Sequence, residues 1–214
     1  MTKAATESHV VNEAETKLLE SALQLFSEKG YEGTSIREII EGAGVTRPVL
    51  YYYFENKEDL FKRLVQSRFS SVVAQIEEVI RQTQSCRERL IGAICQSFLL
   101  SEEHPEALRL ILQVFFSPPQ QGPSLDKNQM MRQRFRLIEH IMRDGLENEE
   151  LSGGDAQSLA LVFLGIMDMH AMAKSNRPET RLTQELGVSL VDFFLAGAGY
   201  RESPKTALVS PYSS

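Results

Sequence analysis

The sequence contains few of the residues that stabilise secreted proteins or bind metals. It has two cysteines and no tryptophan among 214 residues. Cys86 and Cys95 are nine positions apart in one predicted helix, so they lie on roughly opposite faces and cannot form a disulfide within it. Their spacing also differs from the C-x-x-C pattern of metal sites. We therefore expect no metal, no cofactor and no disulfide framework.

Long apolar runs and a secretory leader are also missing from the pattern. The first eleven residues are polar, whereas a leader needs an apolar central segment. No run approaches the roughly 20 apolar residues that a membrane-spanning helix needs. These features predict a cytoplasmic protein without a membrane partner.

The sequence also has no excess of positively charged residues. The formal net charge of the chain is −6. Residues 1–64 hold eight Lys and Arg against eleven Asp and Glu, which gives this segment a charge of −3. Domains that bind nucleic acid are usually basic. The charge therefore counts against a DNA partner, unless the few cations gather on one face and helix N-termini hold the phosphates.

The sequence lacks the motifs of the common enzyme classes. Hydrolytic or transfer chemistry needs a nucleophile with a base, or a metal cluster. Neither G-x-S-x-G nor H-E-x-x-H occurs, and there is no glycine-rich phosphate-binding loop. The four histidines are scattered, at His9, His104, His140 and His170. We do not expect an enzyme.

Residues 34–59 predict two short helices, a tight turn between them and the start of a longer helix. Ser35 begins a capping box at the first helix. Gly42 and Gly44 supply the open backbone conformations of the turn, and Thr46 can cap the second helix. A helix–turn–helix unit of this size presents its second helix to the DNA major groove. The same residues also fit a small helical hairpin with surface tyrosines.

This segment is similar to a known family signature. Residues 44–60, G-V-T-R-P-V-L-Y-Y-Y-F-E-N-K-E-D-L, follow a helix that ends F-S-E-K-G-Y-E-G-T-S. Together they resemble the TetR/AcrR family of bacterial transcriptional regulators, over about residues 13–64. The resemblance implies a homodimer that binds a double-stranded DNA operator and a small-molecule effector, usually as a repressor.

Position in the family motif implies which residues contact DNA. Arg37 and Arg47 are the candidates for contacts to bases or nearby phosphates. Thr46, Val49 and Tyr52 would line the groove. The remaining candidates anchor phosphates or, in the case of the proline, shape the start of the second helix: Thr34, Ser35, Pro48, Tyr51 and Lys57.

Helical spacing of apolar residues recurs along the chain, and no strand alternation is visible. We predict an all-α protein of about nine helices. A flexible arm (1–11) precedes a three-helix, helix-turn-helix DNA-binding domain (12–56), whose first helix starts near Asn12. A connector helix beginning at residue 57 opens a helical effector-binding and dimerisation domain (57–200). A disordered tail (201–214) follows.

The last two predicted helices, residues 156–174 and 180–196, carry more apolar surface than one chain obviously needs. Small residues such as Gly165 and Gly197 would let helices approach closely. Surplus apolar helix faces usually belong to a core or an interface. In the resembled family these helices pair with their copies in a four-helix bundle, so we expect a homodimer through them.

The middle helices contain large, soft residues suited to an adaptable ligand chamber. Each of these residues also fits an ordinary core position. A few polar residues nearby, Asp168 among them, could anchor a ligand. The candidates for the ligand site are Phe98, Gln113, Phe116, Met131, Phe135, His140, Met142, Met167 and His170. The composition of this chamber predicts a small, hydrophobic effector.

We interpret the chain as a ligand-responsive repressor that binds a palindromic operator as a homodimer and is released by its effector. The connector helix belongs to both domains, so ligand binding would reach the recognition helices through a population shift. Two alternatives remain open. One is a helical ligand-binding or adaptor protein that does not bind DNA, which the negative charge of the first domain favours; the other is an enzyme.

Overall fold

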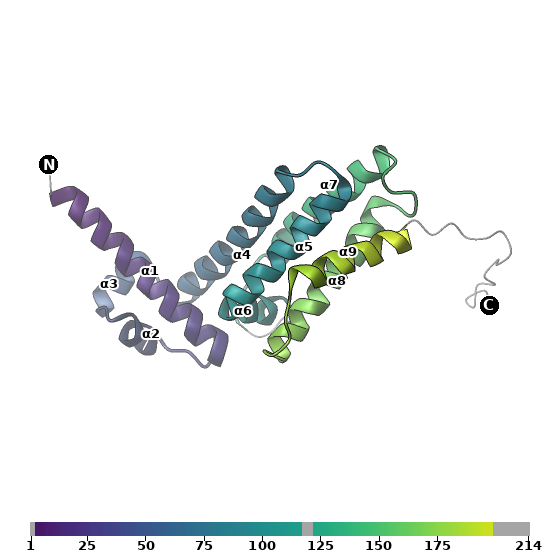
Figure 1. Ribbon diagram of the computed structural model, residues 1–214. Coiled ribbons are helices and arrows are strands. Elements are labelled where there is room, and N and C mark those ends of the chain that lie inside the picture. The colour runs from purple at the N-terminus through teal and green to yellow at the C-terminus, as the bar shows by residue number, and fades with distance from the viewer. Residues whose placement is uncertain (1–2, 117–121, 199–214) are drawn as a thin grey trace.

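A computed structural model describes residues 3–116 and 122–198 of the chain (Figure 1). Nine helices and no strand occur in this part, which confirms the predicted all-α fold. The predicted tail (201–214) lies outside the described residues. The helices are α1 (Lys3–Lys29), α2 (Ile36–Ala43), α3 (Arg47–Tyr53), α4 (Lys57–Arg81), α5 (Cys86–Glu103), α6 (Pro105–Phe116), α7 (Lys127–Glu147), α8 (Ala156–Asn176) and α9 (Gln184–Ala198).

Helix α1 begins at Lys3 and not at the predicted Asn12. The intervening residues include neither proline nor glycine, so nothing in this stretch interrupts a helix. Most of the segment predicted as an arm (1–11) is therefore helical, which corrects that expectation.

Helix α4 begins where the connector helix was predicted. The Asn56 side chain accepts a hydrogen bond from the Asp59 backbone N–H, which caps the helix start. Leu60 and Leu64 of α4 are buried with the first three helices, while Ile76 and Ile80 are buried with the later ones. One helix thus contributes to both halves of the molecule, as its apolar pattern predicts.

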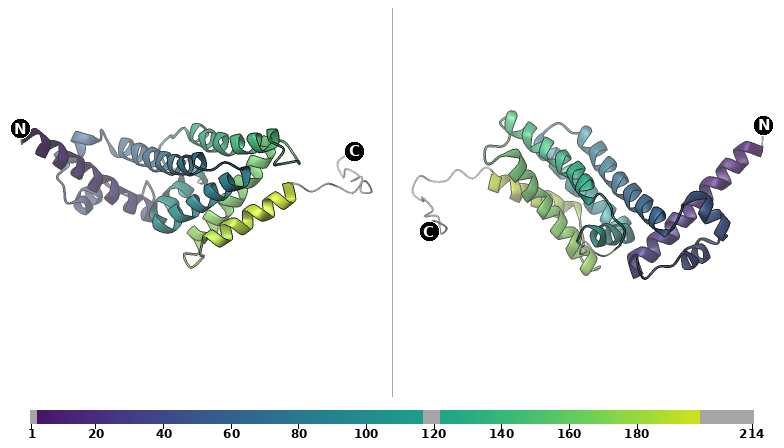
Figure 2. Two further views of the ribbon diagram at one scale, coloured as in Figure 1. Left: turned by 45° about the horizontal axis from the view of Figure 1, so that its top comes forward. Right: turned by 180° about the vertical axis from the view of Figure 1, so that it is seen from behind.

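The boundary between the two hydrophobic cores does not coincide with the predicted domain boundary at residue 57. The first core joins α1–α4 and also includes Leu110 and Val114 of α6 and Met130 of α7. The second core is formed by α5, α7, α8 and α9 with the end of α4. Helices α1–α3 lie at one end of the molecule and α8 and α9 in the other half (Figure 2). Helix α6 therefore packs against the helix–turn–helix end directly.

Helix α8 is long and apolar enough to cross a membrane by length and composition alone. No other described helix passes this test, and the sequence pattern had predicted none. Two charged side chains interrupt the helix and both are paired: Asp168 with Arg134, and Lys174 with Glu102. One side of α8, including Phe163 and Met167, is buried in the second core. A partly buried core helix has the same composition as a membrane span.

Candidate DNA-binding surface and ligand cavity

Helix α2 begins and ends as its sequence predicts. The Ser35 side chain accepts a hydrogen bond from the Glu38 N–H, and the Glu38 carboxylate accepts one from the Ser35 N–H, so the capping box of α2 is complete. Gly44 ends the helix with φ 65°, and its N–H points to the carbonyls of Ile40 and Glu41. Thr46 occupies the N-cap position of α3 but makes no side-chain capping bond, so its predicted capping role is wrong.

Gly42 serves the packing of α2 on α1 instead of the turn. The Ser21 hydroxyl donates a hydrogen bond to the Ile39 carbonyl at 3.0 Å. A Cβ atom added at Gly42 would lie 2.4 Å from the Ser21 oxygen. The glycine therefore allows the two helices to approach closely.

Helix α3 buries one side and exposes the other. Leu50 and, just beyond the helix, Phe54 are buried in the first core. On the opposite side Tyr51 is 47% exposed and Tyr52 is 74% exposed. The Arg47 guanidinium lies 6.0 Å from the centre of the Tyr51 ring. Large aromatic and cationic side chains thus face solvent at the start and middle of α3.

Most of the predicted DNA contacts lie at the surface of the α2–α3 unit. Val49 is half-buried. The exposed ones are Ser35, Arg37, Thr46, Arg47, Pro48, Tyr51 and Tyr52. They come from one end of the molecule, where α2 and α3 are joined (Figure 1). Their individual roles stay predictions.

Two of the predicted phosphate anchors donate their hydrogen bonds to backbone carbonyls of the protein itself. Thr34 is 2% exposed, and its hydroxyl donates to the Gly30 carbonyl at 2.9 Å. Lys57 Nζ donates to the carbonyls of Tyr31 at 2.9 Å and Thr34 at 3.0 Å, and lies 4.1 Å from the centre of the Tyr31 ring. Thr34 and Lys57 therefore hold the α1–α2 loop against the start of α4, and their predicted phosphate contacts are not supported.

Several acidic residues at this end are neutralised by neighbouring cations. Glu41 pairs with Arg37 at 2.7 Å, and Glu38 pairs with Lys29 at 2.6 Å. The hydrogen bond from Lys29, followed by those from Ser35, lowers the pKa of the Glu38 carboxyl from 4.5 to about 2. Arg47 has no ion-pair partner within the described ranges. These pairs leave the net charge of the segment at −3, but the exposed Arg47 places a positive charge at the start of α3.

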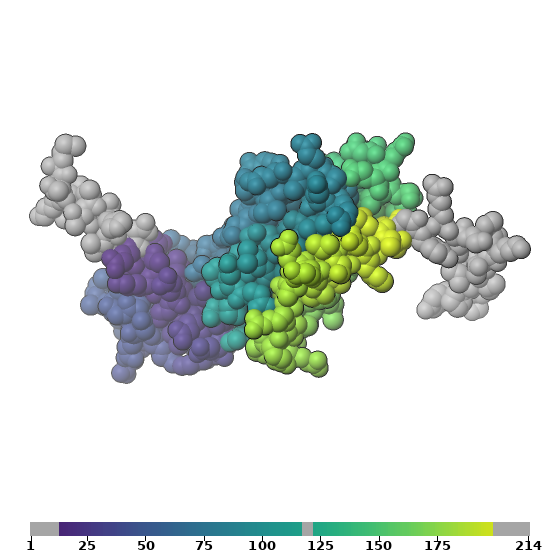
Figure 3. All heavy atoms as spheres, in the orientation of Figure 1, coloured from purple at the N-terminus to yellow at the C-terminus, as the bar shows by residue number. Residues whose placement is uncertain are grey.

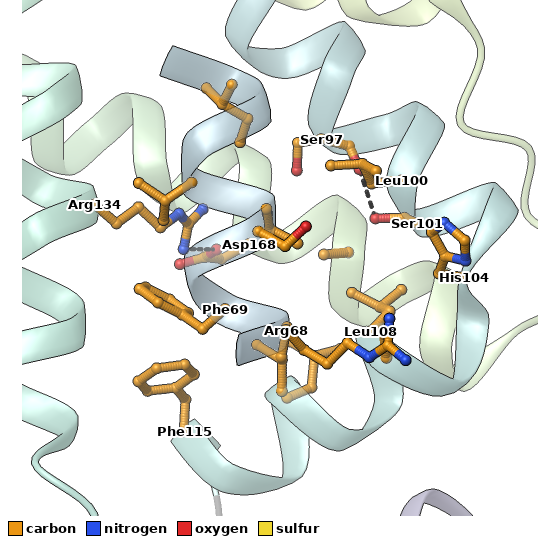
Figure 4. Close-up of a pocket in the computed structure, with 18 of the residues that line it drawn as sticks. Arg68, Phe69, Ser97, Leu100, Ser101, His104, Leu108, Phe115, Arg134 and Asp168 are labelled. Carbon is orange, nitrogen blue, oxygen red and sulfur yellow. Dashed lines mark hydrogen bonds and ion pairs between the residues drawn. The ribbon is translucent and has the colours of Figure 1, made fainter. Parts of the chain in front are cut away.

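A cavity of about 380 Å³ lies among α4, α5, α6, α7 and α8. Most of its wall is apolar, with Phe69 on α4 and Phe115 on α6 next to each other at one side (Figure 4). The two rings are 5.5 Å apart between centroids. On the opposite side, Ser101 and His104 face the space from the end of α5.

The charged groups of the cavity come from three helices. Arg134 on α7 pairs with Asp168 on α8 at 2.6 Å, and their side chains are 19% and 24% exposed. Arg68 on α4 and Lys127 at the start of α7 also line the space. The cavity therefore combines a large apolar wall with cationic groups, a combination suited to an amphipathic ligand.

Two of the nine predicted ligand residues, Phe116 and Met131, line this cavity. Gln113 instead donates to the Ser27 carbonyl at 3.1 Å, and the His140 side chain is 69% exposed. The His170 ring nitrogen Nδ1 lies 2.7 Å from the Ile166 carbonyl of its own helix. The others, Phe98, Phe135, Met142 and Met167, pack in or against the second core. These seven residues therefore lie outside the lining of this cavity.

Four residues that line the cavity were not predicted from the sequence, namely Arg68, Phe69, His104 and Arg134, and Asp168 was predicted only as a possible anchor. They are spread over three helices, α4, α7 and α8, and the turn between α5 and α6. Apolar periodicity shows which side of each helix is buried, but it does not show which buried sides leave space between them. No signal in the sequence alone would have brought these residues together.

Comparisons with known proteins agree with this architecture. The family described as "Bacterial regulatory proteins, tetR family" matches residues 18–64. The transcriptional repressor KstR2 of Mycobacterium tuberculosis is 30% identical over 145 residues, which cover 64% of this chain and 68% of that protein. The fatty acid metabolism regulator of Bacillus subtilis is 24% identical over 154 residues, which cover 71% of this chain and 78% of the relative.

Solved structures share the fold along most of the chain. The B. subtilis regulator FadR in complex with stearoyl-CoA has a TM-score of 0.73 at 21% identity, covering 85% of this chain and 98% of that one. AibR in complex with isovaleryl coenzyme A and operator DNA has a TM-score of 0.68 at 20% identity, with coverage of 85% and 98%. The chain belongs to the TetR family of bacterial regulatory proteins. It is a DNA-binding transcriptional regulator, not an enzyme.

Proposed function

We propose that the protein is a cytoplasmic repressor that binds a palindromic operator as a homodimer and is released by a small amphipathic effector. The observation that carries the proposal is a partly charged cavity whose wall includes the two helices that pack against the helix–turn–helix end, α4 and α6. The adaptor alternative rested on the negative charge of the first domain. Ion pairs leave that net charge unchanged, but the exposed guanidinium of Arg47 at the start of α3 has no acidic partner among the described residues.

The DNA contacts are assigned to exposed residues of the α2–α3 unit. Arg47 would contact a base edge, since its guanidinium is exposed at the start of α3. Arg37 would contact a phosphate or base in place of its ion pair with Glu41. Such exposed pairs contribute little to stability, so this exchange costs little. The Tyr51 hydroxyl would donate to a phosphate. The groove and backbone contacts are completed by Ser35, Thr46, Pro48, Val49 and Tyr52.

The homodimer would form through one side of α8 and α9. Leu161, Val162 and Met169 of α8 are more than half exposed. They recur at helical spacing opposite the buried side of the helix. Phe193 of α9 is 76% exposed, and α9 lies open on one face of the molecule (yellow in Figure 3). An apolar surface of this kind usually marks an interface.

The effector would occupy the cavity among α4–α8. Its volume of about 380 Å³ is near the lower end of the roughly 300–1,000 Å³ of ligand pockets. FadR and AibR were solved with acyl-coenzyme A compounds. Together with the apolar wall, this favours an acyl compound whose chain lies inside the cavity.

Helix α6 would transmit occupancy of the cavity to the DNA-binding end together with α4. Leu108 and Ile111 line the cavity, whereas Leu110 and Val114 belong to the first core. Gln113 adds a hydrogen bond to the Ser27 carbonyl of α1. A ligand that shifts α6 or α4 therefore changes the population of DNA-binding geometries by its difference in affinity for the two states.

The proposal is tested by selecting genomic fragments with the purified protein beside an Arg37→Ala/Tyr51→Ala double variant. We expect the wild type to enrich a palindromic site and the double variant to enrich none. On the selected site, Tyr51→Phe should weaken binding on all sequences alike, whereas Arg47→Ala should relax the preference at one position. The reverse pattern would reject these roles, and no enrichment with or without cell extract would reject the proposal.

A further inference from the structure

The ionisable lining of the cavity is predominantly cationic, although the whole chain has a net charge of −6. Arg68, Lys127 and Arg134 line the space together with a single carboxylate, Asp168. That carboxylate is already bound by Arg134 at 2.6 Å. The cavity therefore has positive charge that the protein itself does not neutralise, and an anionic ligand would complement it.

Arg68 differs from Arg134 because it has no partner in the described part of the chain. No carboxylate, carbonyl or hydroxyl there makes a hydrogen bond or ion pair with it. Its side chain is half-buried and reaches toward Leu108 at the apolar wall (Figure 4). A guanidinium offers five donors in a planar fork that matches a carboxylate or phosphate, and a charge near apolar surface is costly without a partner.

We propose that Arg68 binds the anionic group of the effector, so that the effector is an anionic amphiphile with an aliphatic part. This inference rests on the proposed function of the cavity as the effector site. The aliphatic part would lie against the apolar wall that includes Phe69 and Phe115. The anion is either the carboxylate of a free acid or a phosphate of a coenzyme A thioester, because a guanidinium binds both in the same way.

The position of Arg68 in α4 relates anion binding to DNA binding. Its neighbours Leu64, Val65 and Phe69 are buried in the first core, which contains the helix–turn–helix unit. A ligand bound to Arg68 can therefore shift α4 next to the residues that pack against the helix–turn–helix unit. An anion at Arg134 would first have to displace Asp168, so Arg68 is the stronger anchor.

The test compares ligands that differ only in the polar group. Dodecanoate, dodecanol and dodecanoyl-coenzyme A are titrated by calorimetry into the wild type, Arg68→Gln and Arg68→Lys. Arg132→Gln is the matched control, because Arg132 is exposed on α7 and does not line the cavity. We expect at least one anionic probe to bind the wild type roughly 10- to 100-fold more tightly than dodecanol, the range of charge-assisted hydrogen bonds.

Arg68→Gln should remove this preference and leave dodecanol binding unchanged, which also reports an intact cavity. Arg68→Lys should keep part of the preference, and Arg132→Gln all of it. If the loss affects dodecanoate, the anion is a carboxylate; if it affects only the thioester, the anion is a phosphate.

The inference is overturned if dodecanol binds the wild type as tightly as both anionic probes, if Arg68→Gln retains their preference, or if no probe binds. Failure of the regulator proposal has a different signature. In that case dodecanoate or the thioester would still bind through Arg68, but the protein would enrich no palindromic DNA.

Discussion

At the scale of single residues, one ionised carboxylate at the DNA-binding end, that of Glu38, connects two helices. Glu38 accepts hydrogen bonds from the Lys29 ammonium and from the Ser35 backbone and hydroxyl. It thereby joins the end of α1 to the start of α2. The position of α2 against α1 is thus partly controlled by one ionised carboxylate.

Stability should fall in acid through Glu38. Its pKa is about 2 in the folded protein, below the ordinary 4.5, so its contribution is complete above pH 4.5 and is lost as the pH falls toward 2. We expect Glu38→Gln to be less stable than wild type at neutral pH and to lose less stability on acidification. Urea unfolding across this pH range measures both effects. Glu77→Gln, at an exposed position of α4, should follow the wild type; equal acid sensitivity of Glu38→Gln and wild type would contradict the assignment.

Residue patterns predicted those contacts that are close in sequence. The capping box at Ser35 and the left-handed Gly44 depend on residues within four positions, so motif spacing was sufficient. Lys57 instead meets carbonyls 23 and 26 positions away. Its place in the family motif suggested a phosphate contact, and only the fold shows that the ammonium is used internally.

At the scale of helices, α8 and α9 are held against α5 by a buried polar cluster. Lys174 is 8% exposed, and its Nζ donates to Glu102 at 2.7 Å and to the carbonyls of Pro178 at 3.1 Å and Thr180 at 2.9 Å. The other Glu102 oxygen accepts the Leu182 N–H at 2.8 Å. This cluster fixes the α8–α9 connection, on which the proposed dimer surface depends.

Replacing the buried ammonium should destabilise the protein more than replacing an exposed one. We expect Lys174→Met to lower the free energy of unfolding by about 2 kcal/mol, because carbonyls and a carboxylate lose a charged donor. Lys17→Met removes an exposed pair with Glu13, whose side chains are 51% and 59% exposed, and should cost less than about 1 kcal/mol. Urea unfolding of both variants tests this difference. Equal losses would show that the Lys174 cluster contributes no more than a surface pair.

Helix positions could be predicted from periodicity, but the arrangement of helix sides around the cavity could not. Apolar spacing predicted α6, in which Leu108 and Leu110 are only two positions apart. In the fold Leu108 lines the cavity and Leu110 belongs to the first core. Both surroundings are apolar, so the sequence does not distinguish them. The same ambiguity placed Phe98 and Met142 in the predicted ligand site although they are core residues.

At the scale of the whole molecule, the proposed repressor needs two copies to span two half-sites. The outer side of α8 is apolar, and a Cβ added at Gly165 or at Gly197 of α9 would meet no atom within 4 Å in the single chain. Small residues next to large exposed ones, such as Phe193, allow helices from two copies to pack closely. The apolar composition that gives α8 the appearance of a membrane span therefore fits a subunit interface.

A charge placed on this surface should separate the subunits without unfolding them. Phe193 is 76% exposed in the single chain, so Phe193→Arg adds little strain there but buries an unpaired charge in the dimer. We expect the dimer dissociation constant to rise by at least roughly 30-fold, the effect of losing about 2 kcal/mol at a central interface residue. Sedimentation velocity measures the dissociation, and operator binding should weaken with it because each monomer reaches one half-site.

Leu99→Arg is the matched control, since Leu99 is a 47% exposed apolar residue on α5, outside the proposed interface. It should leave the dimer and operator affinity unchanged. If Leu99→Arg separated the subunits and Phe193→Arg did not, the dimer would form through α5 instead of α8 and α9. The spacing of the two recognition helices would then have to be derived from that surface.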